Sequence, residues 1–298
     1  MMNKKYFLQA MAMMLGVVLS VSFVSCGDDD EDDSGSSTPA VSNSVLSSRL
    51  KDVNGKTLLL TACGGYEYKY SNNGALYECG GRPYEVDGLT YKCSYSGTNI
   101  EGSFNLNRDG LVSKANCKIE EFDRESGILE WVCNWEFSYS YNAEKQLQKV
   151  EATTHQQDCD ESGTPKSNGE EHAVLTYTWA NGNLEKVVTT TQDVGYVSDH
   201  FFHPSVYTFT YGNELNVTRQ PVRSLEIIED AGMIDVHMLG LFGIGPRNFP
   251  ISYTLEKTEE DGDTYKGSES ISFTLNDDGS INTETVSRYD AYQYTYMK

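Results

Sequence analysis

The sequence is poor in basic residues, because 23 Lys and Arg stand against 44 Asp and Glu and give a net charge of −21 at pH 7. A surface of this sign repels phosphate, which excludes nucleic acid as a partner. After residue 25 no stretch reaches the roughly 18 consecutive apolar residues of a membrane-spanning helix, which excludes a polytopic helical membrane protein. The Gly-x-Ser-x-Gly, His-Glu-x-x-His and phosphate-loop motifs are also missing. The sequence therefore indicates no cofactor, and the hypothesis leans away from an enzyme without excluding one.

Aromatic residues are abundant instead. They make up 11% of the chain, with 20 tyrosines, and 38% of all residues are hydrophobic. A chain of this composition can bury enough apolar surface to offset the entropy lost on folding. We therefore expect a folded protein rather than disorder throughout.

Residues 1–25 have the pattern of a secretory signal peptide, with Lys4 and Lys5 ahead of an apolar core at residues 7–24. Small residues and then Cys26 follow that core, as in the bacterial lipobox, although Phe23 stands where Leu is usual. We therefore predict that Cys26 becomes the lipidated N-terminus, since several acyl chains anchor a protein stably. The alternatives are an ordinary signal peptide or an uncleaved anchor.

Residues 26–44 are predicted to be a disordered tether that is acidic at first and rich in Ser and Gly afterwards. Six consecutive acids at residues 28–33 cannot pack together, and the Ser/Gly/Pro segment at 34–39 continues the linker. Acids directly after a lipidated cysteine resemble the surface-export signal of Bacteroidetes lipoproteins. This resemblance implies an outer-membrane anchor, with the protein facing the cell exterior. The simpler reading of the acids is a spacer.

From residue 45 to 298 we expect a single β-rich domain, because period-two alternation recurs around turn residues. An aromatic-x-aromatic stretch, a polar turn that usually holds Asn-Gly or Asp-Gly, and a second alternating run recur. These repeats occupy residues 66–79, 102–112, 137–150, 175–187, 207–217 and 271–281. The pattern predicts an all-β fold, an antiparallel up-and-down meander or barrel of about a dozen strands.

Residues 223–245 break the alternation. The segment is rich in Leu, Ile, Met and Gly, has partly helical spacing, and is followed by Pro246 and Pro250. We expect a short helical or irregular insertion that covers or plugs an open end of the barrel.

These features together resemble a family of Bacteroidetes lipoproteins of unknown function with a porin-like fold. The resemblance lies in the acidic tether after Cys26, the tyrosine hairpins, the segment 238–250 and the tyrosine-rich end at 289–296. Phe249 stands where the family more often has Leu, and the cysteines beyond Cys26 depart from the family. The resemblance implies an antiparallel barrel-like fold and no assigned activity.

A membrane-spanning barrel is disfavoured even so. Each of its strands needs an apolar stripe that faces the lipid. Residues 185–193 and 283–288 are largely polar on both faces. We therefore expect a soluble barrel or curved sheet rather than one that crosses a membrane.

Six cysteines follow the lipidation site: Cys63, Cys79, Cys93, Cys117, Cys133 and Cys159. An even number in an exported chain favours disulfides, of which 15 connectivities are possible. Cys117 and Cys133 are symmetric about a turn at residues 123–127, so we predict that they face each other. Cys79 and Cys93 are nearly symmetric about a second turn, which leaves Cys63 with Cys159. The alternative is buried thiols; zinc is disfavoured because no Cys-x-x-Cys spacing occurs.

Three weaker patterns are noted. His200 and His203 could share a metal only on a helix, and neighbouring Pro204 disfavours one. Residues 259–263 and 276–280 resemble fragments of calcium loops but are better explained as hairpin turns. The tryptophans could stack on sugars if exposed, although such aromatic stripes are more often core; they are Trp131, Trp135 and Trp179.

The leading hypothesis is a lipid-anchored outer-membrane lipoprotein that acts as a non-catalytic binding or structural module. Its partners would be membrane lipid through acylated Cys26 and a glycan, a peptide or a membrane protein. One alternative is a hydrolase of glycan or peptide with a site at the barrel mouth. Another is a carrier of a small apolar ligand beneath the segment 223–245.

Overall fold

The computed structural model describes most of the chain after the expected tether. The described residues are 48–64, 66–72, 74–79, 82–83, 89–95, 97–197, 200–223, 238–259, 262–287 and 291–297. The expected signal peptide at 1–25 and tether at 26–44 lie outside them, as does most of the segment 223–245.

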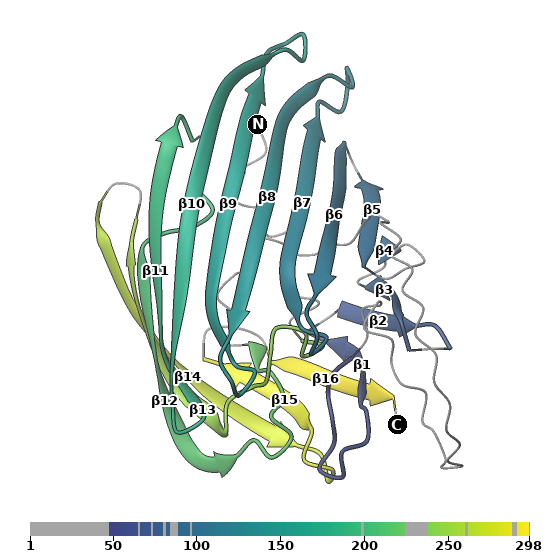
Figure 1. Cartoon of the computed structure of the whole chain (residues 1–298), viewed down its shortest axis with the longest axis vertical. Coiled ribbons are helices and arrows are strands. Elements are labelled where there is room, and N and C mark those ends of the chain that lie inside the picture. The colour runs from purple at the N-terminus through teal and green to yellow at the C-terminus, as the bar shows by residue number, and fades with distance from the viewer. Residues whose placement is uncertain are drawn as a thin grey trace, which may run out of the picture.

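The described chain folds into one sheet of sixteen strands, and every pairing is antiparallel (Figure 1). The strands are β1 (Leu59–Cys63), β2 (Tyr66–Tyr70), β3 (Leu76–Cys79), β4 (Arg82–Pro83), β5 (Thr90–Tyr95), β6 (Thr98–Leu106), β7 (Val112–Phe122), β8 (Leu129–Tyr141), β9 (Leu147–Cys159), β10 (Pro165–Ala180), β11 (Asn183–Gly195), β12 (Ser205–Leu215), β13 (Asn248–Thr258), β14 (Thr264–Leu275), β15 (Ile281–Val286) and β16 (Tyr292–Met297). The predicted all-β antiparallel meander is confirmed, with more strands than the dozen expected.

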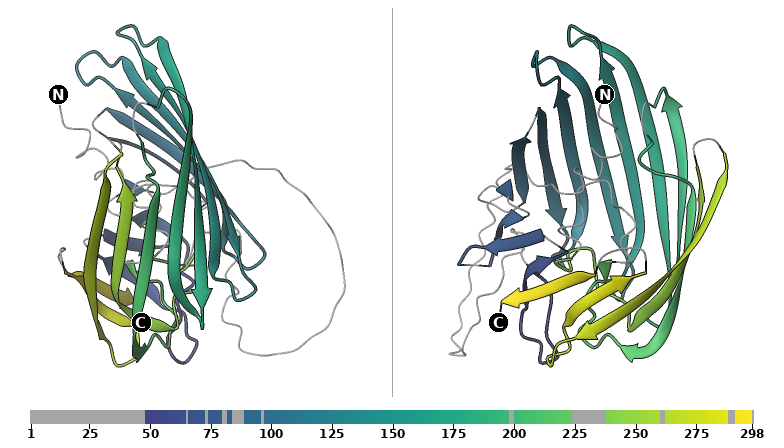
Figure 2. Two further views of the ribbon diagram at one scale, coloured as in Figure 1. Left: turned by 90° about the vertical axis from the view of Figure 1, so that its left-hand side faces the viewer. Right: turned by 180° about the vertical axis from the view of Figure 1, so that it is seen from behind.

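Strands pair with their neighbours in the chain, and β1 also pairs with β16, so the order runs β4-β3-β2-β1-β16 and back down to β5. The sheet is not closed, because its two edges are β4 and β5. The β11–β12 ladder covers only Lys186–Thr189 opposite Ser205–Thr208. Above this ladder, β12–β14 diverge from the long strands β6–β11. The sheet therefore has the curved, open shape visible in Figure 2.

The aromatic repeats have a common structure at the lower end of the sheet. In each one the register shifts just before the last aromatic or apolar residue of the first alternating run, as between Ser140 and Tyr141 or between Thr178 and Trp179. Such a bulge re-aims the following side chain. Four of these side chains then donate a hydrogen bond to a backbone carbonyl of a neighbouring strand. These bonds join Tyr70 to Leu60, Tyr141 to Val112, Trp179 to Leu147 and Tyr211 to Leu184, at 2.8, 2.6, 2.7 and 2.9 Å.

One of the six predicted hairpins is wrong. We expected a turn at residues 212–214, but β12 continues through them to Leu215. The extra residues form an irregularity, because Tyr211 lies opposite Pro250 and Leu215 lies opposite Asn248. As in the other repeats, a bulge precedes Tyr211, and the Tyr211 hydroxyl donates a hydrogen bond to the neighbouring strand. The repeat pattern here therefore specifies the bulge rather than a reversal of the chain.

The core lies on the inner face of the curved sheet. Trp135, Phe137 and Tyr139 alternate along β8 with polar residues that point outward, and all three are buried. Residues 238–242 of the expected insertion are also buried, and the Phe242 ring lies 4.8 Å from that of Tyr139. The described part of the insertion is irregular rather than helical. Backbone bonds hold it near Leu239 and Leu241, whose carbonyls accept from the N–H groups of Arg49 and Val112.

The predicted Cys117–Cys133 disulfide is wrong. Cys117 lies opposite Trp135 and Cys133 lies opposite Ile119, because the turn pairs Asp123 with Ile128 and the register shifts by a further residue between Glu121 and Phe122. The two cysteines share a face but stand diagonally, and Cys63, Cys117, Cys133 and Cys159 are present as thiols.

The remaining two predicted bridges have different outcomes. The Cys63–Cys159 bridge is wrong as well, because these thiols lie on β1 and β9, which are not neighbours in the sheet. The side chains of Cys79 and Cys93 lie outside the described part of the structure.

Candidate functional site

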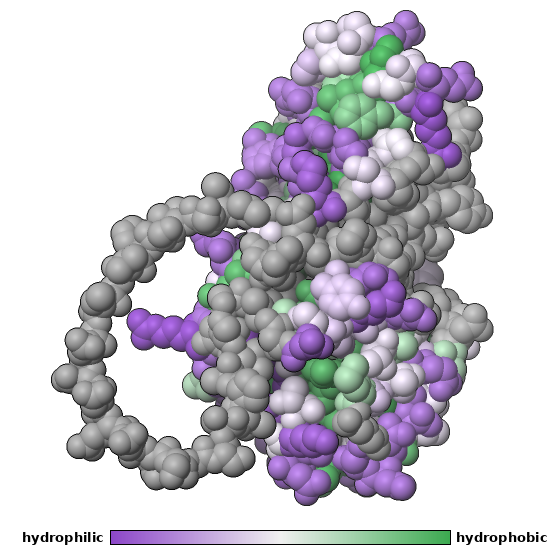
Figure 3. All heavy atoms as spheres, turned by 90° about the vertical axis from the view of Figure 1, so that its right-hand side faces the viewer, coloured by the Kyte–Doolittle hydropathy of each residue, from purple (hydrophilic) through white to green (hydrophobic). Residues whose placement is uncertain are grey.

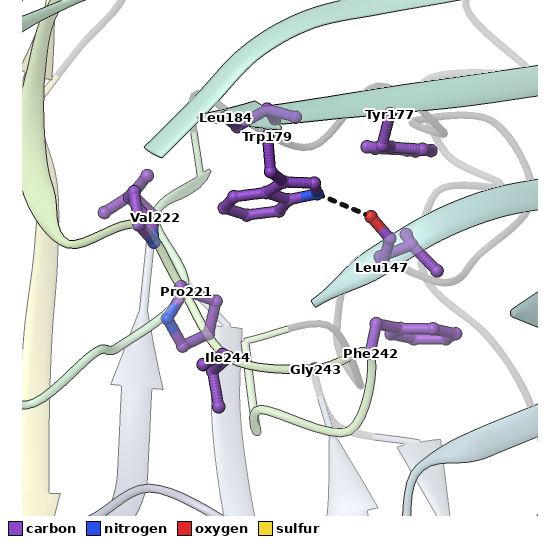
Figure 4. A pocket seen from close by; sticks show the side chains of 11 residues that line it. Leu147, Tyr177, Trp179, Leu184, Pro221, Val222, Phe242, Gly243 and Ile244 are labelled. Atoms are coloured by element: carbon purple, nitrogen blue, oxygen red, sulfur yellow. Dashed lines mark hydrogen bonds between the residues drawn. The ribbon is translucent and has the colours of Figure 1, made fainter. Parts of the chain in front are cut away.

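A pocket opens at the lower end of the sheet, where β9 begins, β10 ends and β11 begins (Figure 4). It holds about 390 Å³ of space, including the part open to solvent. Its wall is almost wholly apolar, with Leu147, Tyr177, Trp179, Leu184, Pro221, Val222, Phe242, Gly243, Ile244, Gly245 and Pro246. A concave, apolar wall with a few polar groups at its border is typical of binding sites for small molecules.

The indole of Trp179 forms the centre of the sheet-side wall. It is only partly buried, and its Nε1–H donates a hydrogen bond of 2.7 Å to the Leu147 carbonyl (Figure 4). The bulge before Trp179 and this bond fix the orientation of the ring. One face of a large aromatic side chain is thus presented toward Pro221 and Val222.

The opposite wall is the irregular stretch 242–246. The Ile244 N–H donates to the Lys145 carbonyl, and the Gly245 N–H donates to the Arg219 carbonyl. A Cβ built on Gly245 would lie 2.0 Å from the Gln220 carbonyl oxygen, so only glycine allows this approach of the two segments. The pocket wall is therefore made by backbone contacts between two connections that are distant in sequence.

Two arginines border the pocket. The Arg219 Nε–H donates to the Gly245 carbonyl at 2.8 Å, and Arg247 follows Pro246 and is exposed. A Cβ built on Gly182 would lie 3.2 Å from Arg247 Cβ and 3.8 Å from Arg219 Nη1, so both side chains approach the same glycine. Burial lowers the pKa of Arg219; the charge of Glu144 opposes this effect and that of Arg247 adds to it.

A second polar cluster lies on the inner face higher in the sheet. Trp135, Thr154, Glu171 and Asp193 are directly opposite one another across β8, β9, β10 and β11. The Glu171 carboxylate is fully buried and accepts the backbone N–H groups of residues 201 and 202, each at 3.0 Å.

The connection after β11 covers this cluster. It crosses directly over Gly169, where an added Cβ would lie 1.9 Å from the Tyr196 carbonyl oxygen. The ring of Phe201 then lies 4.3 Å from that of Trp135. His200 Nε2 lies 2.9 Å from Asp193 Oδ2. Glu171 therefore anchors a covering segment and is closed off from solvent.

The carboxyl of Glu171 predicts a pH dependence of folding stability. Burial raises its pKa to about 7 from an ordinary value of 4.5, and the two backbone N–H donors only partly oppose the shift. The folded state therefore binds this proton more tightly, and the stabilisation present below pH 4.5 is lost as the pH rises through 7. We expect wild type to lose roughly 3 kcal/mol relative to Glu171→Gln between pH 4.5 and 8, measured by denaturant unfolding. Parallel stability curves for the two proteins would contradict this assignment.

The residues of the weaker sequence patterns lie in the core, in the pocket wall, in an ion pair and in two turns. Trp131 and Trp135 are buried core residues, not sugar platforms, whereas Trp179 lines the pocket. His200 pairs with Asp193. Residues 259–263 and 276–280 are closed by backbone bonds typical of hairpin turns. No group of three or more potential metal-ligating side chains occurs in the described ranges.

Sequence reasoning missed three residues. The sequence did carry a signal for Glu171, because alternation places this acid on the same face as Ala173, Leu175 and Tyr177. Arg219 and Arg247 had none, because irregular connections bring them together.

Comparisons with known proteins give structural neighbours only. No family model matches the chain, and no curated protein matches it. The chain is similar to a porin-like protein from Bacteroides vulgatus ATCC 8482, at 12% identity over 80% of this chain and 98% of that one, with a TM-score of 0.48. It is also similar to a porin-like protein from Bacteroides uniformis ATCC 8492, at 15% identity over 83% and 95% of the two chains, with a TM-score of 0.42.

Proposed function

We propose that this chain is a lipid-anchored outer-membrane protein that faces the cell exterior and binds a small apolar ligand without catalysis. The observation that carries the binding function is the apolar pocket beside Trp179. The anchor rests on the sequence at Cys26, followed by an acidic tether long enough to hold the folded part away from the membrane.

The side chains on the outer face of the sheet support a domain whose outer face is exposed to water rather than to lipid. Lys118 pairs with Glu120 and Lys149 pairs with Glu151 on outward positions of β7 and β9. A spanning strand would present apolar side chains to lipid at such positions. On the side of β2–β5, the described residues show hydrophilic and hydrophobic side chains interspersed, without a continuous apolar band (Figure 3). Among the described residues, no helix has the length and apolarity needed to cross a membrane.

The structural role of the buried Glu171 carboxylate favours a binding function over hydrolysis. A catalytic carboxyl must reach the substrate. Both oxygens of Glu171 are instead held by the backbone of the covering segment. The pocket itself offers ring faces and aliphatic groups, which suit apolar contact.

The anchor is tested with Cys26→Ala. We expect the wild-type chain, expressed in a Bacteroides host with an alkyne-bearing fatty acid, to incorporate the acyl label and fractionate with the outer membrane. The variant should incorporate none, and added proteinase should digest the wild-type protein on intact cells. Equal labelling of the variant would contradict lipidation at Cys26, and full protection of the protein on intact cells would contradict outward display.

The pocket is tested with a neutral photoreactive ligand, an octanol that carries a diazirine. We expect it to crosslink to peptides within 177–184, 221–222 and 242–246, and Val222→Trp to reduce that labelling at least fivefold by filling the pocket. Val194→Trp is the matched control, because Val194 is an exposed residue of β11. Labelling that is spread over the sheet, or equal in Val222→Trp and wild type, would contradict the proposed site.

A further inference from the structure

The border of the pocket is positively charged in a strongly acidic protein. The net charge of the chain is −21, yet the guanidinium of Arg219 and the side-chain stem of Arg247 both lie close to Gly182 beside the apolar wall. Neither Arg219 nor Arg247 takes part in an ion pair between described residues. The nearby positive charge is therefore available to a bound group.

The guanidinium of Arg219 is held in place by the fold. Its Nε–H donates to the Gly245 carbonyl at 2.8 Å and its Nη2–H to the Gly182 carbonyl at 3.4 Å. Arg247 is anchored by its backbone, because its N–H donates to the Gly182 carbonyl at 2.8 Å. One arginine is thus oriented and the other is free to adjust at the surface.

The electrostatics favour an anion at this border. Like charges that are close together and partly desolvated disfavour each other, and an anion between them relieves that repulsion. Among the described residues, the charge of Glu144 raises the pKa of Arg219 and that of Arg247 lowers it. Guanidinium groups match the geometry of carboxylate and phosphate oxygens.

We propose that the ligand is an anionic amphiphile, with a short apolar chain in the pocket beside Trp179 and its anionic head group at Arg219 and Arg247. This inference rests on the proposed binding function and names its ligand class. A free fatty acid, an alkyl phosphate and the head group of an anionic lipid share the required chemistry.

The test uses three photoreactive probes of equal chain length on the full chain in phosphatidylcholine nanodiscs. The probes are diazirine-bearing octanoate, octanol and octyltrimethylammonium, and empty nanodiscs provide the blank. We expect octanoate to label the pocket peptides at concentrations about tenfold lower than octanol, and the ammonium probe to label them least. Phosphatidylglycerol nanodiscs distinguish a lipid head group from a free amphiphile as the natural ligand. If the site binds the lipid head group, phosphatidylglycerol competes and octanoate labelling falls. If the site prefers free amphiphiles, octanoate labelling is unchanged.

Charge variants then assign the head-group contact. Arg247→Gln and Arg219→Gln/Arg247→Gln should each lower octanoate labelling to the level of octanol labelling of the same variant. The single variant Arg247→Gln is included because it is expected to fold normally, since the Arg247 side chain is exposed. Arg124→Gln/Lys166→Gln removes the same charge near the opposite end of the sheet and should change nothing. Equal labelling by octanoate and octanol in wild type would overturn this inference and leave the apolar site standing, whereas failure of all three probes at the pocket would overturn the proposed function itself.

Discussion

Trp135→Ala is expected to lower the free energy of unfolding by about 4 kcal/mol, the usual loss for a fully buried aromatic side chain. Trp135 is 1% exposed, and its ring lies 4.3 Å from Phe201, 5.7 Å from Phe137 and 6.0 Å from Phe202. Its indole N–H has no hydrogen-bond partner in the structure, so the loss is one of packing. Denaturant unfolding followed by circular dichroism measures the change.

The same substitution should loosen the segment that covers Glu171. Phe201 and Phe202 would lose their main ring partner, so we expect faster proteolysis within residues 196–204. Tyr196→Ala is the control, because this aromatic is 63% exposed and its loss should change stability by less than about 0.5 kcal/mol. A loss below 1 kcal/mol for Trp135→Ala would show that the covering segment does not depend on this aromatic cluster.

Gly245→Ala is expected to lower stability by about 3 kcal/mol, because the new methyl group meets backbone rather than a movable side chain. The added Cβ would lie 2.0 Å from the Gln220 carbonyl oxygen and 2.6 Å from its carbonyl carbon. The two connections must separate, which breaks the bond from the Gly245 N–H to the Arg219 carbonyl. Ligand labelling at the pocket should fall together with stability.

Gly267→Ala is the matched control for that substitution. Gly267 also lies in close contact, but its neighbour is the side chain of Tyr265, which is 40% exposed and can move aside. We expect a change below about 1 kcal/mol and unaltered labelling at the pocket. Similar effects of the two substitutions would contradict the tight approach at Gly245.

Local patterning in the sequence was enough to predict most of the sheet. Alternation and Asn-Gly or Asp-Gly turns located the hairpins whose first strands end near Leu106, Trp179 and Leu275, because both signals act over a few residues. The same reasoning failed at residues 212–214, where β12 continues because its partner β13 comes from beyond a long connection. It failed for Cys117 and Cys133 because the turn pairs Asp123 with Ile128 and a bulge adds a further residue, so the register differs by two residues from symmetry about Glu125.

The candidate site was less predictable than the strands. A lid or plug at residues 223–245 was expected, and the buried Met238, Leu239 and Leu241 agree with that role over the described part. The meeting of Arg219, Gly245 and Gly182 depends on how three connections pack in space. No local pattern encodes such a contact between segments distant in sequence.

The most direct test of the binding function is a crystal structure of the protein grown with 8-bromooctanoate, with anomalous data collected at the bromine edge. The account predicts a bromine peak inside the pocket, between Trp179 and Phe242, and the carboxylate beside Arg219 and Arg247. Bromine on the outer face of the sheet, with the pocket closed by its own side chains, would contradict the account.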